Sequence, residues 1–92
     1  MSATHDPLRH RFVIATPHGD AELVYRPRAD GTLDLQHTFV PVEARGGTLA
    51  SELVEAAVAH ARAGDLRLIA TCPYVRRWRE RHPEAADRFV AP

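Results

Sequence analysis

The spacing of apolar residues in this chain changes at Pro41. Before Pro41, segments at residues 12–15, 20–26 and 32–40 are rich in β-prone or alternating apolar residues, and turn-forming residues separate them. After Pro41, apolar residues recur every three or four positions over residues 49–61, which is the period of a helix with one buried face. This order predicts an antiparallel sheet of three strands, with an amphipathic helix following it.

The remaining segments predict a mixed α/β (α+β) fold. An apolar run at residues 66–70 predicts a fourth strand, which a right-handed crossover places parallel to the third strand. Pro73, at a first helical position, predicts a second helix over residues 74–82. The predicted order is βββαβα, a mostly antiparallel sheet flanked by two helices. We expect residues 1–10 to form a loose N-terminus and residues 11–92 to form one domain.

Composition limits the classes of partner. A chain of 92 residues is one small domain, so any ligand is expected in a groove rather than in a deep cavity. The 12 basic residues balance the 12 acidic ones, and zero net charge argues against nucleic-acid binding. No apolar run reaches the roughly 18–20 residues of a membrane span, so no membrane contact is expected. The single cysteine, Cys72, excludes an internal disulfide and fits a reducing compartment, which predicts a cytoplasmic protein.

The junction between the third strand and the first helix is the strongest local signal of a ligand. A Gly-Gly pair there precedes the helix, and the backbone N–H groups at a helix N-terminus favour phosphate or pyrophosphate. A plain connecting turn also uses such a pair, so the glycines alone leave both interpretations open.

The residues of this junction resemble a known signature. Residues 45–50, Arg-Gly-Gly-Thr-Leu-Ala, are similar to the coenzyme A pyrophosphate loop of the GNAT superfamily of N-acetyltransferases, Gln/Arg-x-x-Gly-x-Gly/Ala. Five fragments in order resemble a subfamily of very small GNAT-like proteins, which contain little beyond the acetyl-CoA half of the fold. The resemblance runs from about residue 12 to residue 90. The fragments are His37-Thr-Phe-Val-Pro41, Arg45-Gly46, Leu53-Val54, Cys72-Pro-Tyr-Val75 and Arg81-His-Pro-Glu84.

The resemblance implies a truncated GNAT-like fold with acetyl-CoA as cosubstrate. The backbone of Phe39 and Val40 would line the pantetheine arm. Thr48 departs from the signature, because it stands where the family has a central glycine. Either its N–H and hydroxyl donate to the phosphates, or its Cβ pushes the cofactor away. The pyrophosphate would be wrapped by Arg45, Gly46, Gly47, Thr48, Leu49 and Ala50.

Three residues are candidates for catalysis. His37 falls on the apolar face of its strand, where it is either a packed core residue or the base that takes a proton from the acceptor amine. Cys72 precedes the second helix, where it either fills the core or acts as a nucleophile that carries the acetyl group. Tyr74 either protonates the departing thiolate, as a tyrosine does in many similar enzymes, or packs against Trp78. In the similar subfamily the histidine and the cysteine occur together on the active-site side.

The second helix carries four arginines. They are interpreted either as a contact for the 3′-phosphate of the cosubstrate or for an acidic partner, or as a solvated face paired with the acidic residues nearby. The six histidines lack ligand spacing, so no metal is expected. The arginines are Arg76, Arg77, Arg79 and Arg81, and the acidic residues are Glu80, Glu84 and Asp87.

Two functions follow from these observations. The first is an acetyl-CoA-dependent N-acetyltransferase whose acceptor is a primary amine, either a small molecule or a protein lysine. The second is a regulatory or interaction module that binds coenzyme A or acetyl-CoA with little catalysis.

Overall fold

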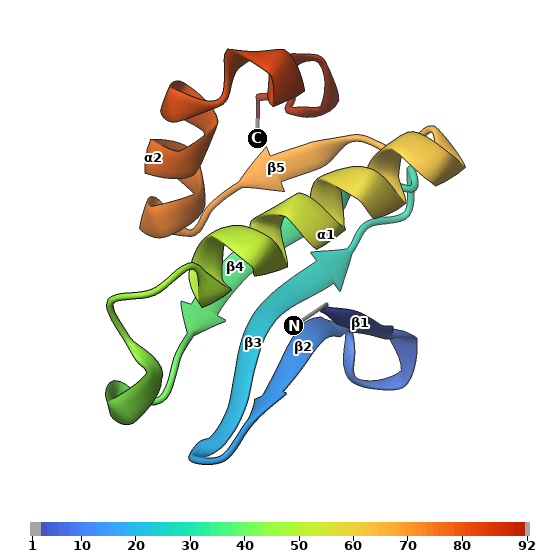
Figure 1. The fold of residues 1–92 in the computed structure, drawn as a ribbon. Helices are drawn as coiled ribbons and strands as arrows, with labels where there is room; N and C mark the ends of the chain where they lie inside the picture. The colour runs from blue at the N-terminus through green and yellow to red at the C-terminus, as the bar shows by residue number, and fades with distance from the viewer. Residues whose placement is uncertain (1–2, 92) are drawn as a thin grey trace.

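The structure is a computed structural model and describes residues 3–91. Its centre is a sheet of five strands in the order β1-β2-β3-β4-β5 (Figure 1). The first three pairs of neighbouring strands are antiparallel, and β4 and β5 are parallel. The strands are β1 (Thr4–Asp6), β2 (Arg11–Thr16), β3 (Gly19–Pro27), β4 (Leu33–Phe39) and β5 (Leu68–Ala70).

Within residues 3–91, two α-helices and three short 3-10 helices complete the fold. Helix α1 lies across the sheet, and α2 lies beyond β5 (Figure 1). This arrangement confirms the predicted mixed α/β fold and the predicted parallel pairing of β4 with β5. The helices are η1 (Pro7–Arg9), η2 (Val42–Ala44), α1 (Leu49–Gly64), α2 (Pro73–Arg81) and η3 (Pro83–Arg88).

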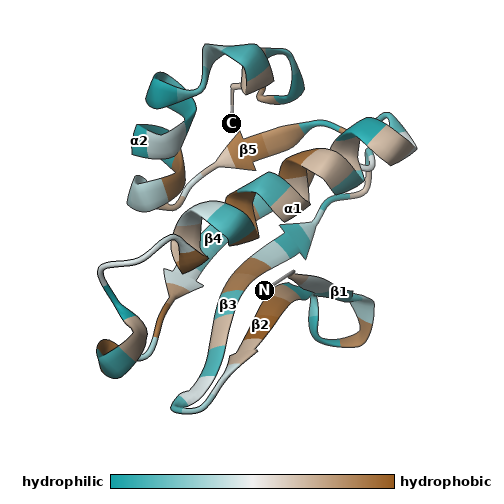
Figure 2. Cartoon of the chain, viewed as in Figure 1, coloured by the Kyte–Doolittle hydropathy of each residue, from teal (hydrophilic) through white to brown (hydrophobic). Residues whose placement is uncertain are grey.

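The core lies between α1 and one face of the sheet. The side of α1 that carries the apolar stripe is fully buried there, and the alternating strands supply the opposing layer. In Figure 2, β5 is apolar throughout, because this short strand is buried on both of its faces. The core side chains of α1 are Leu53, Val54, Ala57, Val58 and Ala61, and those of β2, β3 and β4 are Phe12, Ile14, Ala21, Leu23, Tyr25, Leu33 and Leu35.

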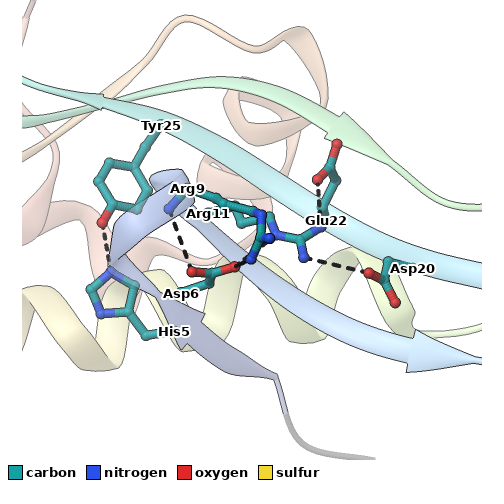
Figure 3. Close-up of polar contacts among 7 residues, drawn as sticks. All are labelled: His5, Asp6, Arg9, Arg11, Asp20, Glu22 and Tyr25. Carbon is teal, nitrogen blue, oxygen red and sulfur yellow. Dashed lines mark hydrogen bonds and ion pairs between the residues drawn. The ribbon is translucent and has the colours of Figure 1, made fainter.

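The prediction of a loose N-terminus was wrong for the residues that the structure describes. Strand β1 pairs with β2, and the imidazole of His5 contacts the hydroxyl of Tyr25 at 2.6 Å (Figure 3). The ring of His5 also stacks on Phe12, with 4.7 Å between ring centroids, and lies 4.3 Å from the ring of His60 in α1. Side-chain contacts with three other elements therefore hold a strand of three residues.

Arg11 joins β1, β2 and β3 on the outer face of the sheet. Its guanidinium contacts Asp6 at 3.2 Å, Glu22 at 3.0 Å and Asp20 at 3.4 Å (Figure 3). Arg9 makes a second contact with Asp6 at 3.3 Å. We call these five residues the Arg11 cluster. Each charge therefore has an opposite partner, and with two guanidiniums and three carboxylates the cluster carries one net negative charge.

Candidate functional site

Strands β4 and β5 separate after a short pairing. Their last paired residues are Leu35 and Ala70, and the N–H of Cys72 donates a hydrogen bond to the carbonyl of Leu35 at 2.9 Å. Strand β5 ends at Ala70, whereas β4 continues to Phe39 (Figure 1). Within the described part of the chain, the edge of β4 beyond Leu35 therefore has no partner strand, and its backbone groups on that side are available to a ligand.

An open groove of about 450 Å³ follows this free edge. It is bounded by the end of β4, by the turn that leads into α1 and by the start of α2. The expectation of a groove rather than an enclosed cavity fits this geometry. The lining residues are His37, Thr38, Phe39, Val40, Ala44, Arg45, Gly46, Gly47, Leu49, Ala50 and Tyr74.

A β-bulge in β4 changes which side chains face the core. The pairing between β3 and β4 shifts between Val24 and Tyr25, so Val24 lies opposite His37 and Leu23 opposite Thr38. Because Leu23 points into the core, Thr38 also faces α1, and His37 lies on the exposed outer face. The prediction that His37 lies on the apolar face of its strand was therefore wrong. His37 still borders the groove, from its solvent side.

Thr38 is the residue of this strand that the sequence prediction missed. Its side chain is partly buried, and its Oγ1 lies 3.4 Å from the Sγ of Cys72. Cys72 is only 5% exposed and does not line the groove, so its thiol lies behind Thr38. As predicted, Cys72 precedes α2, where it is the N-cap residue. The unbroken alternation of the sequence gave no signal for Thr38, because the bulge is decided by pairing with β3.

The glycine turn opens directly onto the groove. Gly46 has φ +90°, a conformation that favours glycine, and a Cβ built at either Gly46 or Gly47 would meet no atom within 4 Å. Arg45 stabilises the turn, because its Nε donates a hydrogen bond to the carbonyl of Val40 at 2.8 Å. The turn therefore leaves open space in front of the N-terminus of α1.

Thr48 directs its side chain away from the groove. It is the N-cap residue of α1, and its hydroxyl donates a hydrogen bond to the carboxylate of Glu52 at 2.7 Å. Thr48 is absent from the lining of the groove, in contrast to its neighbours Gly47 and Leu49. Its side chain is therefore directed along the helix rather than into the space where phosphates would bind.

Tyr74 lies in the first turn of α2 and lines the groove on the side opposite β4. Burial raises the pKa of its hydroxyl, although Arg81 and Arg77 act in the opposite direction. The hydroxyl therefore carries its proton at neutral pH and is a proton donor. The ring that stacks on Trp78 is that of His82, with 4.0 Å between ring centroids. Tyr74 thus borders the groove, and it also packs against the core cluster that includes Trp78.

The expected pairing of the helix arginines with nearby acidic residues was wrong. Among the described residues, Glu84 pairs with His82, and Asp87 pairs with Arg62 and Arg88. Arg76 instead donates a hydrogen bond to the carbonyl of Ala70 at 2.9 Å, and so fixes the start of α2 against the end of β5.

Two negative findings apply to residues 3–91. No three His, Cys, Asp or Glu side chains there are grouped so that they would hold a metal ion. No helix in this part of the chain has both the length and the apolar character needed to cross a membrane.

Comparison with known proteins places these features in a family. Residues 11–88 match the family model described as GCN5-related N-acetyl-transferase. The chain is 34% identical over 94 residues to Protein NATD1 of Danio rerio, and the match covers 98% of this chain and 86% of that protein. It is 35% identical over 81 residues to Protein NATD1 of Xenopus tropicalis, and this match covers 86% and 74% of the two chains.

A solved structure has the same fold. It is the solution structure of a GCN5-like putative N-acetyltransferase from Staphylococcus aureus, with a TM-score of 0.71 and 23% identity. The similarity covers 99% of this chain and 89% of that one. The groove beside the divergent strands, the glycine turn before α1 and the family match agree with one another, and the chain belongs to the GCN5-related N-acetyltransferase family.

Proposed function

We propose that this protein is an acetyl-CoA-dependent N-acetyltransferase that transfers the acetyl group to a primary amine. The observation that carries the proposal is the course of the groove. It begins at the glycine turn before α1, follows the free edge of β4 and ends beside Tyr74. One end therefore suits phosphates, and the other offers a proton donor for a thiolate.

The glycine turn fits the pyrophosphate end of coenzyme A. The space above Gly46 and Gly47 is open, and the first N–H groups of a helix such as α1 have no partner within the helix. These groups, together with the positive end of the helix dipole, favour a bound anion. The backbone of Phe39 and Val40, which line the middle of the groove, would then follow the pantetheine arm and polarise the thioester carbonyl.

The residues around the far end of the groove support direct transfer. Acetyl-CoA supplies an activated acetyl group as a thioester. The acceptor nitrogen attacks the carbonyl carbon, so a C–N bond forms and the C–S bond breaks. His37 takes the proton from the nitrogen, directly or through a water molecule, and Tyr74 donates a proton to the departing sulfur. The products are an amide and free coenzyme A, so atoms and charge balance.

The alternative route through an acetylated Cys72 has less support. The thiol is buried, lies behind Thr38 and is already in contact with its hydroxyl. We therefore expect Cys72→Ala to retain most of the rate and His37→Ala to lose about 10²- to 10⁴-fold. Intact-mass spectrometry of the protein with acetyl-CoA and no amine would contradict direct transfer if it showed a hydroxylamine-labile adduct that Cys72→Ala lacks.

A protein lysine is the acceptor that we favour over a small amine. The groove is open, and two apolar residues next to it are exposed, Phe39 at 42% and Val42 at 69%. An open site with exposed apolar residues beside it leaves room for a large acceptor such as another protein. We also assign the protein to the cytoplasm, because its single cysteine is a free thiol.

One observation favours the second candidate, a coenzyme A-binding module with weak catalysis. His37, the proposed base, lies on the solvent side of the strand, and no side chain among residues 3–91 holds its ring in place by a hydrogen bond. Binding without transfer would place the protein in this second class.

Binding and transfer are tested in two steps. The first is the shift in melting temperature with acetyl-CoA, because ligand at 100 times its dissociation constant adds about 2.7 kcal/mol of stability. Gly47→Asp should abolish this shift, since it adds negative charge facing the phosphates, whereas the matched neutral variant Gly47→Asn should retain more of it. Neither side chain meets an obstacle at this position. An undiminished shift in Gly47→Asp would remove the turn from the site.

The second step is transfer of isotope-labelled acetyl to a lysine-rich protein and, separately, to small primary amines. Label in either acceptor supports the enzyme and identifies its acceptor class. A thermal shift without label in any acceptor would support the binding module instead.

A further inference from the structure

Thr38 and Cys72 meet where β4 and the start of α2 approach each other, and the proposed function uses their contact only as an argument against an acetylated cysteine. The hydrogen bond between the N–H of Cys72 and the carbonyl of Leu35 closes the gap between β4 and the start of α2. Three residues further along β4, Thr38 lines the groove and contacts the thiol of Cys72 at 3.4 Å. Neither Leu35 nor Cys72 reaches the groove, so Thr38 forms the surface at this end.

The end wall is rigid because buried elements support it on each side. Cys72 is 5% exposed, and Leu35 and the neighbouring Val75 of α2 are fully buried. The β-bulge directs Thr38 toward Cys72, and pairing with Leu23 of β3 fixes the backbone. Thr38 therefore has no free space behind it into which it would retreat from a larger ligand.

The wall lies where the acyl group of a bound coenzyme A thioester is expected. If phosphates bind at the glycine turn, the acyl end of a coenzyme A thioester lies at the opposite end of the groove, near Thr38 and Tyr74. This step rests on the proposed function. We infer that Thr38, supported by Cys72, limits the length of the acyl chain, so that the site accepts an acetyl group and rejects longer unbranched acyl groups.

The chemistry of the wall agrees with a small acyl group. The β-branched side chain of threonine has few rotamers, so it gives the wall a defined shape. Forcing extra methylene groups against a packed wall is unfavourable, and one misfitting methylene in a specific pocket changes discrimination by about 10- to 200-fold. Thr38 is in this sense a specificity-determining residue, and Cys72 positions it.

The test compares coenzyme A, acetyl-CoA, propionyl-CoA and butyryl-CoA by isothermal titration calorimetry, with kcat/KM for the thioesters where transfer is measurable. The wild type should bind acetyl-CoA at least tenfold more tightly than butyryl-CoA. Thr38→Ala removes the wall and should reduce this ratio to about twofold. Thr38→Val, which has nearly the same shape, should keep the ratio, because volume rather than the hydroxyl decides it.

Thr38→Ser provides a second, milder variant if Thr38→Ala does not fold. It removes one methyl group and retains the hydroxyl, so propionyl-CoA should gain affinity more than butyryl-CoA does. Equal wild-type affinity for acetyl-CoA and butyryl-CoA, or an unchanged ratio in Thr38→Ala, would overturn the inference while leaving the proposed function intact. If neither coenzyme A nor any thioester binds, the proposed function fails and this inference fails with it.

Discussion

The two ends of the sheet use their polar side chains in different ways. At the β1–β3 end, the Arg11 cluster pairs one partly buried guanidinium with three carboxylates, and His5 contacts Tyr25. At the β4–β5 end, the strands separate and Tyr74 faces an open groove. One end is held together by its own polar groups, whereas the other leaves backbone and hydroxyl groups available to a ligand. Stability and binding are therefore expected to respond to different substitutions.

The largest expected effect is on catalysis at the β4–β5 end of the sheet. Tyr74→Phe should lower kcat by about 10²- to 10⁴-fold, because the departing thiolate loses its proton donor. The melting temperature and the affinity for acetyl-CoA should change little, since the ring still lines the groove. Steady-state kinetics with calorimetric binding checks both parts. A normal kcat in Tyr74→Phe would show that another group or water protonates the sulfur.

At the β1–β3 end of the sheet, we expect a substitution in the Arg11 cluster to affect stability only. Arg11→Met removes the hydrogen bonds to Asp6, Glu22 and Asp20 and should lower the free energy of unfolding by about 1–3 kcal/mol. The control is Arg9→Met, which should cost less than about 0.5 kcal/mol, because that side chain is exposed and makes a single ion pair. Urea unfolding measures both. Lower acetyl-CoA affinity in folded Arg11→Met would show that binding at the β4–β5 end depends on the Arg11 cluster.

The contacts of His5 predict a dependence of stability on pH. Burial, and next the neighbouring His60, lower the pKa of His5 below its ordinary value of 6.5, while Asp6 acts in the opposite direction. Because the unfolded chain binds a proton more readily, this contribution is complete above about pH 6.5 and is lost as pH falls toward the lowered pKa. His5→Gln should flatten the decline in the free energy of unfolding over this range. A profile identical to that of the wild type would show that His5 does not cause it.

His60→Gln sharpens the same prediction. It removes one of the two causes that lower the pKa of His5, so the decline in stability should become shallower without disappearing. NMR titration of the His5 imidazole should show its midpoint moving upward in this variant. A downward movement would contradict the assigned role of His60.

The smallest effect is expected at Thr48. Replacing it with the glycine of the family signature should change the dissociation constant for acetyl-CoA by no more than about twofold, because its side chain contacts Glu52 and does not line the groove. The loss of stability should be a few tenths of a kcal/mol, as is usual for threonine to glycine at a helix N-cap. Binding that becomes tenfold tighter would show that the threonine obstructs the phosphates.

Periodicity predicted the elements with long, regular patterns and missed those that depend on contacts distant in sequence. The stripe over α1 and the alternation in β3 were sufficient to place these elements. Strand β1 was missed because it has three residues and depends on partners such as Tyr25, 20 positions away. The Arg11 cluster likewise joins residues of three strands, and nothing in the local sequence indicates that they meet.

The candidate site was predicted in part. The glycine pair and the helix that follows it indicate the turn, and in the structure this turn lines the groove. The positions of His37 and Thr38 were interchanged, since one extra residue in β4 reverses which side chain faces the core. The alternation of Leu33, Leu35 and His37 continues through the bulge, so sequence alone gave the wrong face.

The most direct test of the separation between the two ends is a titration of the ¹⁵N-labelled protein with acetyl-CoA, followed through the backbone amide shifts. We expect the largest changes at residues 37–50 and 72–75, which form the groove and its end wall. The amide shifts of residues 4–16, at the β1–β3 end of the sheet, should remain unchanged. Shift changes centred on residues 4–16, or no shift changes at millimolar acetyl-CoA, would contradict the separation between the two ends.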